Sequence, residues 1–155
     1  MMKNIIVIIG CILLCFLIGF IGSKFQVDSI NSWYVHINKS SLTPPGFVFP
    51  IAWSILYFLI GISLGLLFMS NSEGKKLIVW IGCMQLFFNF IWTFLFFYLQ
   101  NPLLGLIDII ILDILVTLYV VIGLRVVPIS AILFIPYMLW IYFASYLNAY
   151  IYFNN

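Results

Sequence analysis

Five long apolar runs constrain this chain more than any other feature, because each has about the length of a bilayer-crossing helix. Such a helix needs about 20 predominantly apolar residues. The runs cover residues about 5–22, 47–69, 77–99, 104–126 and 129–153. Only 6% of the 155 residues are charged, against about a quarter in a soluble domain, so little polar surface is available to face water. The sequence therefore predicts an all-α integral membrane protein, a bundle of five transmembrane helices forming one domain over residues 1–155.

The connection between the first two runs, residues 23–46, is much longer than the others. It carries Lys24, Asp28, His36 and Lys39. Loops of this length in compact proteins are usually functional or disordered. Proline suits the first turn of a helix and restricts the residue before it, and glycine allows close approach of the backbone. We therefore expect this first loop to act as a lid, fixed over Trp53 by Pro44, Pro45 and Gly46.

Five spans place the two termini on opposite sides of the membrane. The basic residues divide unequally, with Lys3, Lys75, Lys76 and Arg125 on one side and Lys24 and Lys39 on the other. Cytoplasmic loops carry the excess of Lys and Arg. The sequence thus predicts a cytoplasmic N-terminus and an outer first loop.

Aromatic and amide side chains gather in the outer half of four spans. Trp53 and Tyr57 lie four residues apart and share a helix face. Two further stripes follow helical spacing: Gln85, Asn89 and Trp92, and then Tyr137, Trp140, Ala144 and Asn148. Rings with a few hydrogen-bonding groups are typical of a ligand pocket. The pattern predicts a site beneath the first loop for a large, flat, mostly apolar molecule.

Other interpretations compete with the pocket. Trp and Tyr gather at membrane interfaces without binding anything, and we interpret Trp80 in this way. Asn89 could instead tie helices together. Asp108 and Asp113 lie about 140° apart around their helix, and Asp113 is expected to be paired, protonated or beside water. His36 is either an axial ligand to an iron porphyrin or an ordinary loop residue.

The sequence contains none of the common motifs of soluble enzymes. It contains no Gly-rich phosphate loop, no HExxH and no GxSxG, and it has a single histidine. Cys11, Cys15 and Cys83 lie inside apolar runs without ligand-bearing neighbours, so we predict no metal site. The net charge of +2 is too small and dispersed to suggest nucleic acid as a partner. A Gly61-x-x-x-Gly65 spacing permits close helix packing, as in a homodimer.

Four motifs in order resemble the translocator protein family, also called tryptophan-rich sensory proteins or peripheral-type benzodiazepine receptors. They are WY at Trp33–Tyr34, TPPGFVFPIAW at Thr43–Trp53, NFIW at Asn89–Trp92 and IPYMLWIYFASYLN at Ile135–Asn148. The resemblance implies a bacterial member, a membrane receptor or sensor that is often a homodimer. It would bind porphyrins, or haem, and isoquinoline or benzodiazepine drugs, and would require no cofactor. The implied ligand-binding residues are Tyr34, Pro44, Pro45, Gly46, Trp53, Asn89, Trp92, Trp140 and Ala144.

The resemblance also implies two alternative functions. Trp53 and Trp140 match the two tryptophans tied to light-driven porphyrin breakdown in bacterial members, which would make them catalytic residues of a porphyrin-degrading enzyme. A small porphyrin or metabolite transporter is the other alternative, with Asp113 as its local argument. Cholesterol is not an expected partner, because Ala149 and Phe153 stand where sterol-binding members carry Tyr and Arg.

Overall fold

The computed structural model describes residues 2–155, and among them five helices are long and apolar enough to cross a membrane. They are α1 (Met2–Ser32), α2 (Val48–Met69), α3 (Lys75–Thr93) continued by the π-helical segment η1 (Phe94–Tyr98), α4 (Pro102–Val126) and α5 (Pro128–Asn154). The predicted fold class, an all-α membrane-spanning bundle, is confirmed.

The first helix is longer than its apolar run. We predicted a span ending near residue 22, but α1 continues to Ser32. Residues 23–32 contain neither glycine nor proline, and the Ser32 Oγ donates a hydrogen bond to the Asp28 carbonyl 2.8 Å away. Apolar sequence marks where the hydrocarbon ends, whereas a helix continues until its backbone is interrupted. The loop is therefore residues 33–47, which we call the lid loop.

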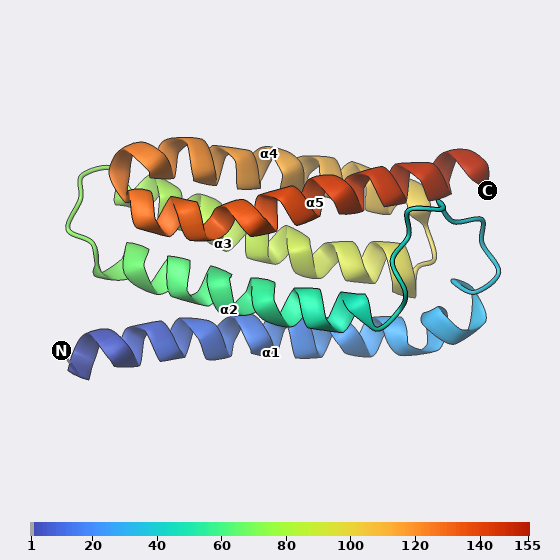
Figure 1. Cartoon of the computed structure of the whole chain (residues 1–155), viewed down its shortest axis with the longest axis horizontal. Coiled ribbons are helices and arrows are strands. Elements are labelled where there is room, and N and C mark those ends of the chain that lie inside the picture. Colours follow the sequence, from blue (N-terminus) through green and yellow to red (C-terminus); the bar gives the residue numbers. More distant parts are fainter. Residues whose placement is uncertain (1) are drawn as a thin grey trace.

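The helices form a closed ring in the order α1, α2, α5, α4, α3 (Figure 1). The Gly61-x-x-x-Gly65 spacing serves the first contact of this ring, within one chain. A Cβ at Gly61 would lie 2.5 Å from the Ile12 Cα, and one at Gly65 would lie 2.8 Å from the Ile8 Cα. Glycine at both positions lets the backbones of α1 and α2 touch.

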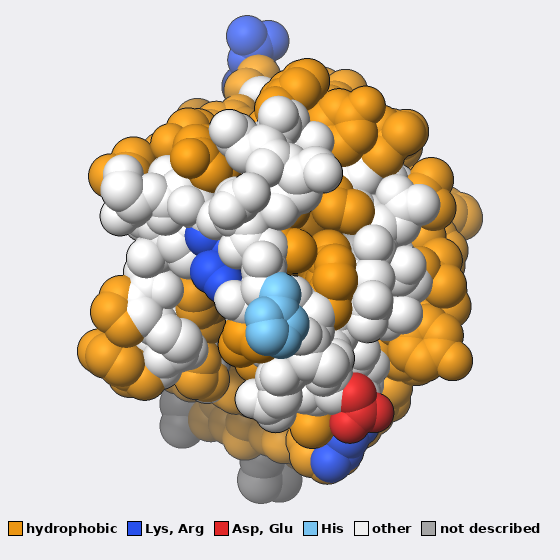
Figure 2. Space-filling model, turned by 90° about the vertical axis from the view of Figure 1, so that its right-hand side faces the viewer, with side chains coloured by type: hydrophobic (Ala, Val, Ile, Leu, Met, Phe, Trp, Pro, Cys, Tyr) orange, Lys and Arg blue, Asp and Glu red, His pale blue; other side chains and the backbone are white. Residues whose placement is uncertain are grey.

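The lid loop and the C-terminal end of α5 lie at the same end of the bundle (Figure 1). Figure 2 shows this end with apolar side chains around the circumference and with His36, the chain's single histidine, among backbone and polar groups near the centre. Such a surface suits a bundle whose sides face lipid and whose end faces water.

The π-helical segment was not predicted from the sequence, which favoured a regular helix to residue 99. Its backbone is wider than an α-helix, and the Leu99 N–H donates to the Phe94 carbonyl. The consecutive residues Phe96 and Phe97 are both buried, with 2% and 9% of their surfaces exposed. The π-helical turn therefore brings two rings into the bundle directly beneath the lid loop.

Candidate functional site

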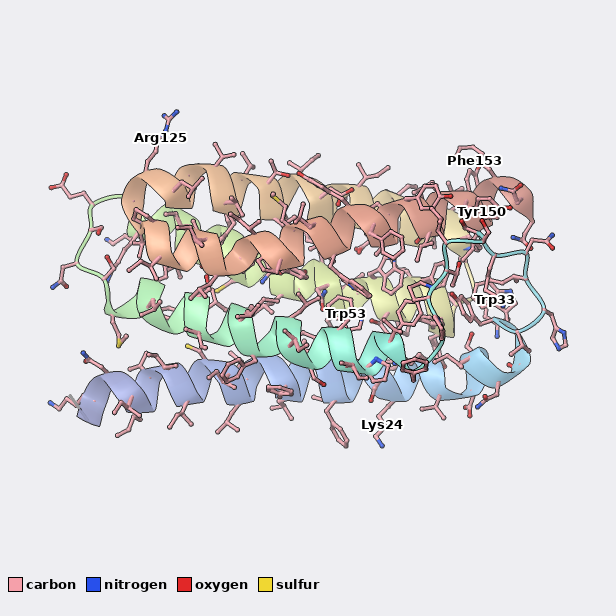
Figure 3. All side chains as sticks on the ribbon, in the orientation of Figure 1. Lys24, Trp33, Trp53, Arg125, Tyr150 and Phe153 are labelled. Carbon is pink, nitrogen blue, oxygen red and sulfur yellow. The ribbon has the colours of Figure 1, made fainter. Side chains whose placement is uncertain are left out.

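The aromatic residues expected on α2 and α5 meet inside the bundle. The ring centroids of Trp53 and Tyr57 lie 5.3 Å apart, and the Trp53 ring lies 6.2 Å from that of Tyr137. Figure 3 shows Trp53 directed from α2 towards the interior. Trp53 is half-buried and packs against the main apolar core. Trp53 and Tyr57 of the α2 stripe and Tyr137 of the α5 stripe therefore form one cluster, which we call the ring cluster. Trp140 of the α5 stripe contacts Phe49 and Phe143 instead.

Asn89 connects three helices at this cluster. Its Oδ1 accepts a hydrogen bond from the Tyr57 hydroxyl at 2.9 Å, and its Nδ2 donates to the Tyr137 hydroxyl at 3.0 Å. Asn89 is only 4% exposed and Tyr137 is fully buried. The amide is thus engaged in tying α2, α3 and α5 together, which was the alternative to direct ligand contact.

Trp92 makes a second amide contact, nearer the lid loop. Its indole Nε1 donates to the Asn148 Oδ1 at 3.0 Å, and the Asn148 Nδ2 donates to the Pro102 carbonyl at 2.9 Å. The Trp92 ring stacks on Phe96 with centroids 5.0 Å apart and planes 12° apart. Trp92 and Asn148 therefore connect the ends of α3, α4 and α5 that lie nearest the lid loop, and Trp92 supports the ring of Phe96.

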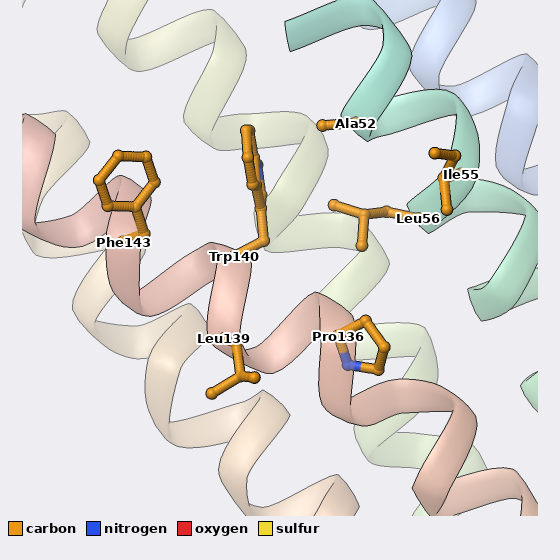
Figure 4. A pocket seen from close by; sticks show the side chains of 7 residues that line it. All are labelled: Ala52, Ile55, Leu56, Pro136, Leu139, Trp140 and Phe143. Carbon is orange, nitrogen blue, oxygen red and sulfur yellow. The ribbon is translucent and has the colours of Figure 1, made fainter. Parts of the chain in front are cut away.

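A groove of about 450 Å³ lies between α2 and α5 (Figure 4). It is lined by Ala52, Ile55, Leu56, Pro136, Leu139, Trp140 and Phe143. Ile55 and Leu139 are 56% and 58% exposed, so the groove opens on the side of the bundle. Of the nine predicted ligand-binding residues only Trp140 lines it. Trp53 and Tyr137 each follow a lining residue directly in sequence, so the ring cluster lies behind the groove wall.

The lid loop packs its first residues on the π-helical segment. Trp33, Tyr34 and Ile37 contact a small core that includes Phe96 and Phe97. The Tyr34 and Phe97 centroids lie 5.5 Å apart. Burial raises the pKa of the Tyr34 phenol, because the charged phenolate loses its hydration. Tyr34 therefore belongs to the packed underside of the loop, and its predicted contact with a ligand stays a prediction.

The proline-rich end of the lid loop is more open than expected. Pro44 is half-buried, whereas Pro45 and Gly46 are exposed. The Val48 N–H donates to the Pro45 carbonyl at 2.9 Å, so the turn does lead into α2. A Cβ at Gly46 would meet nothing within 4 Å, and its φ is not positive. The expectation of a close backbone approach at Gly46 is therefore wrong, since the turn lies on the water-facing surface.

The remaining predicted residues take separate positions. Ala144 is half-buried on α5 and packs against the main core, and it is not one of the residues that line the groove. His36 is exposed and lines a shallow surface hollow of about 380 Å³ with Ser32, Trp33, Ile37 and Gln100. Asp113 is paired with a hydroxyl, because its Oδ2 accepts from the Ser145 Oγ at 2.7 Å.

Asp108 was not predicted as a site residue but lies close to the site. Gly105, one turn before it on the same face of α4, abuts Phe96 and the Asn148 Oδ1, so Asp108 lies just below the contact of Trp92 with Asn148. It is 3% exposed, and its Oδ2 has no hydrogen-bond partner among the described residues. The sequence signal was an acid one turn from a glycine on a buried helix face.

Five apolar helices among the described residues, enclosing an aromatic cluster under a loop, define a multi-pass integral membrane protein. Comparison with known proteins identifies the family to which the chain belongs. Residues 11–153 match the model of the TspO/MBR family, and the chain belongs to this family.

Relatives from three lineages agree with this assignment. The chain is 43% identical over 152 residues to tryptophan-rich protein TspO of Archaeoglobus fulgidus, covering 98% of this chain and 99% of that protein. Identity is 35% over 150 residues with the protein of the same name from Chlorobaculum tepidum, covering 96% and 95%. It is 29% over 132 residues with the translocator protein of Homo sapiens, covering 83% and 78%. The resemblance drawn from the four motifs is thereby confirmed.

Proposed function

We propose that this protein is a membrane receptor or sensor that binds protoporphyrin IX-like tetrapyrroles, and isoquinoline or benzodiazepine drugs, between α2 and α5 beneath the lid loop. Family membership supports the proposal, as does the name "tryptophan-rich sensory protein" of the Cereibacter sphaeroides relative. The observation that carries it is the apolar groove lined by Trp140, with the ring cluster of Trp53, Tyr57 and Tyr137 directly behind it.

The chemistry of the groove favours a flat apolar ligand. Its volume of about 450 Å³ lies within the usual range for small-molecule sites. The Trp140 ring contacts the rings of Phe49 and Phe143, with centroids 6.1 and 5.9 Å away, so aromatic faces and edges stand at the groove wall. A porphyrin entering from the bilayer would stack on Trp140 first. Trp53 comes into contact with the porphyrin when α2 and α5 separate.

Titration with protoporphyrin IX in detergent tests this proposal through the shift of the porphyrin absorption band. We expect Trp140→Phe and Trp53→Phe to weaken binding by up to about threefold each, because phenylalanine keeps an aromatic face but offers a smaller ring than tryptophan. Trp80→Phe is the matched control, because Trp80 is 68% exposed near the opposite end of α3. Equal affinity in all three variants and the wild type would refute this site.

Light-dependent breakdown of the bound porphyrin is a second candidate function. Trp53 lies 5.3 Å from Tyr57 and 6.2 Å from Tyr137 by ring centroids, so the indole stands in a group of electron-rich rings. In this reaction Trp53 or Trp140 donates an electron to the excited porphyrin, and the reduced porphyrin passes that electron to dioxygen. The superoxide adds to the macrocycle and the adduct returns one electron to the indole radical cation, so the net change is addition of dioxygen to the porphyrin and cleavage of a carbon–carbon bond of its ring. Illuminated samples should lose the porphyrin band only with dioxygen present. The Trp53→Phe, Trp140→Phe double variant should retain the band.

We also propose a cytoplasmic N-terminus with the lid loop outside, from the distribution of basic residues. Single-cysteine variants at Ser41 in the lid loop and Asn71 in the loop between α2 and α3 test this orientation. A membrane-impermeant thiol reagent added to intact cells should label the first and not the second. The reverse pattern would invert the topology.

A further inference from the structure

The lid loop is joined to the end of α5 by a compact set of hydrogen bonds. The Asn38 backbone N–H donates to the Asn155 Oδ1 at 2.8 Å, and the Asn155 Nδ2 donates back to the Asn38 carbonyl at 3.1 Å. The Asn38 Nδ2 also donates to the Asn154 carbonyl at 3.0 Å. The side-chain amide of Asn155, the residue directly after α5, therefore pairs with the loop backbone as a neighbouring strand would.

A second contact lies two residues further along the lid loop. The Ser40 and Tyr146 hydroxyls are 2.9 Å apart, and Ser40 is 6% exposed. The Ser40 Oγ also accepts from the Leu42 N–H, which turns the chain towards α2. We call the contacts of Asn38 with Asn155 and of Ser40 with Tyr146 the latch.

Beyond the latch, little holds the lid loop in place. Leu42 and Phe47 are 62% and 67% exposed, and Pro45 and Gly46 are exposed as well. This stretch runs from the end of α5 to the start of α2, the two helices that form the groove (Figure 1). A loop fastened at one end to α5 and continuous at the other with α2 restrains the separation of these two helices at their outer ends.

We propose that the latch controls opening of the lid loop, and that its release separates the outer ends of α2 and α5 and admits the ligand to the ring cluster. The second half of this inference rests on the proposed function. Because the latch hydrogen bonds are exposed or half-buried, water replaces them readily and opening costs little. The buried amide ties of Asn89 and Asn148 remain intact while the loop opens.

Hydrogen exchange in the ligand-free protein tests the latch by itself. Asn155→Ala should increase exchange of the Asn38 amide about fivefold, the effect of losing two exposed hydrogen bonds of ordinary net strength. Asn154→Ala is the matched control, because Asn154 contacts Asn38 through its backbone carbonyl, which alanine keeps, while its side chain donates to the Tyr150 carbonyl. Equal exchange in the two variants would overturn the latch.

Stopped-flow binding of protoporphyrin IX tests the consequence for the ligand. Loss of the latch destabilises the closed free and closed bound states alike, so Asn155→Ala should raise association and dissociation rates about fivefold each and leave Kd within about twofold. Tyr146→Phe should act in the same direction, with Tyr152→Phe as its control. An unchanged association rate would refute control of entry. Failure of the wild type to bind protoporphyrin IX would refute the proposed function instead, while the exchange result still decides the latch.

Discussion

Replacing Asn89 with alanine removes the amide that joins α2, α3 and α5. The structure gives this amide two partners, the hydroxyls of Tyr57 and Tyr137, and leaves Asn89 only 4% exposed. An alanine there leaves both phenols without their partner in a site that water does not reach easily. The variant therefore distinguishes a structural tie from an amide held ready for a ligand.

The cost follows from these contacts. Two hydrogen bonds contribute about 0.5–1.5 kcal/mol each in water, and those between membrane helices average about 0.6 kcal/mol. The fully buried Tyr137 hydroxyl, left unpaired, adds about 1–3 kcal/mol, whereas the half-buried Tyr57 adds less. We expect Asn89→Ala to lower the free energy of unfolding by about 2–4 kcal/mol.

Reversible unfolding in mixed micelles, followed by circular dichroism, measures this loss. Asn71→Ala, at an exposed loop position, is the control and should leave stability unchanged. In a Tyr137→Phe background the same Asn89→Ala change should cost at least about 1 kcal/mol less, because one of its bonds is already gone. Additive costs, or a single-variant loss below about 0.5 kcal/mol, would refute the tie.

Porphyrin affinity separates the two roles of Asn89 further. A structural tie predicts that Asn89→Ala and Tyr137→Phe both weaken binding, because each disturbs the placement of the ring cluster. A direct amide contact with the ligand predicts a loss in Asn89→Ala alone.

Three other variants test the packing. Gly61→Ala should lower the free energy of unfolding by about 1–3 kcal/mol, because the new Cβ would lie 2.5 Å from the Ile12 Cα. Gly10→Ala is its control in the same unfolding assay and should be neutral or stabilising, because a Cβ at Gly10 meets nothing within 4 Å. Gln85→Leu should raise stability by about 1–2 kcal/mol, since this fully buried amide has no partner among the described residues; a loss would indicate a bound water or ligand there. Because burial raises the pKa of Tyr34, its packing on the π-helical segment keeps its full stability below the phenol's ordinary pKa near 10 and weakens as pH rises above that value. Tyr34→Phe should abolish this alkaline loosening, measured as acrylamide quenching of the fluorescence of Trp33 in the lid loop. An unchanged pH profile would contradict it.

The sequence predicted the helices well because hydrocarbon demands long apolar runs, and this demand is local. It predicted less well where the chain leaves the hydrocarbon. The apolar run ends near Gly22, but α1 continues through ten more residues of helix-compatible polar sequence. The prediction from helical periodicity also assumed an α-helix up to residue 99. It therefore could not show that a π-helical turn directs both Phe96 and Phe97 into the bundle.

The candidate site was predictable at the level of helix faces. The stripes containing Trp53, Asn89 and Trp92 do face the interior. Spacing could not show whether an amide on such a face is free or already paired, because its partners come from other helices and depend on packing. Asn89 is paired for this reason, and the latch between Asn38 and Asn155, which are 117 residues apart, has no sequence signal at all.

The polar contacts that join α2 to α5 are buried at one end of the bundle and exposed at the other, and this difference determines where the two helices can separate. At the end opposite the lid loop, the hydroxyls of Ser63, Tyr119 and Ser130 and the Ser130 carbonyl form a fully buried set of contacts at 2.7–2.9 Å that joins α2, α4 and α5. Asn89 forms the next tie towards the lid loop, also buried, whereas the latch at the lid-loop end is largely exposed. Hydrogen bonds away from water are costly to break, and exposed ones exchange with solvent. Separation of α2 and α5 should therefore begin at the lid loop and stop at Asn89, which places the ring cluster at the deepest point that a ligand entering this way can reach.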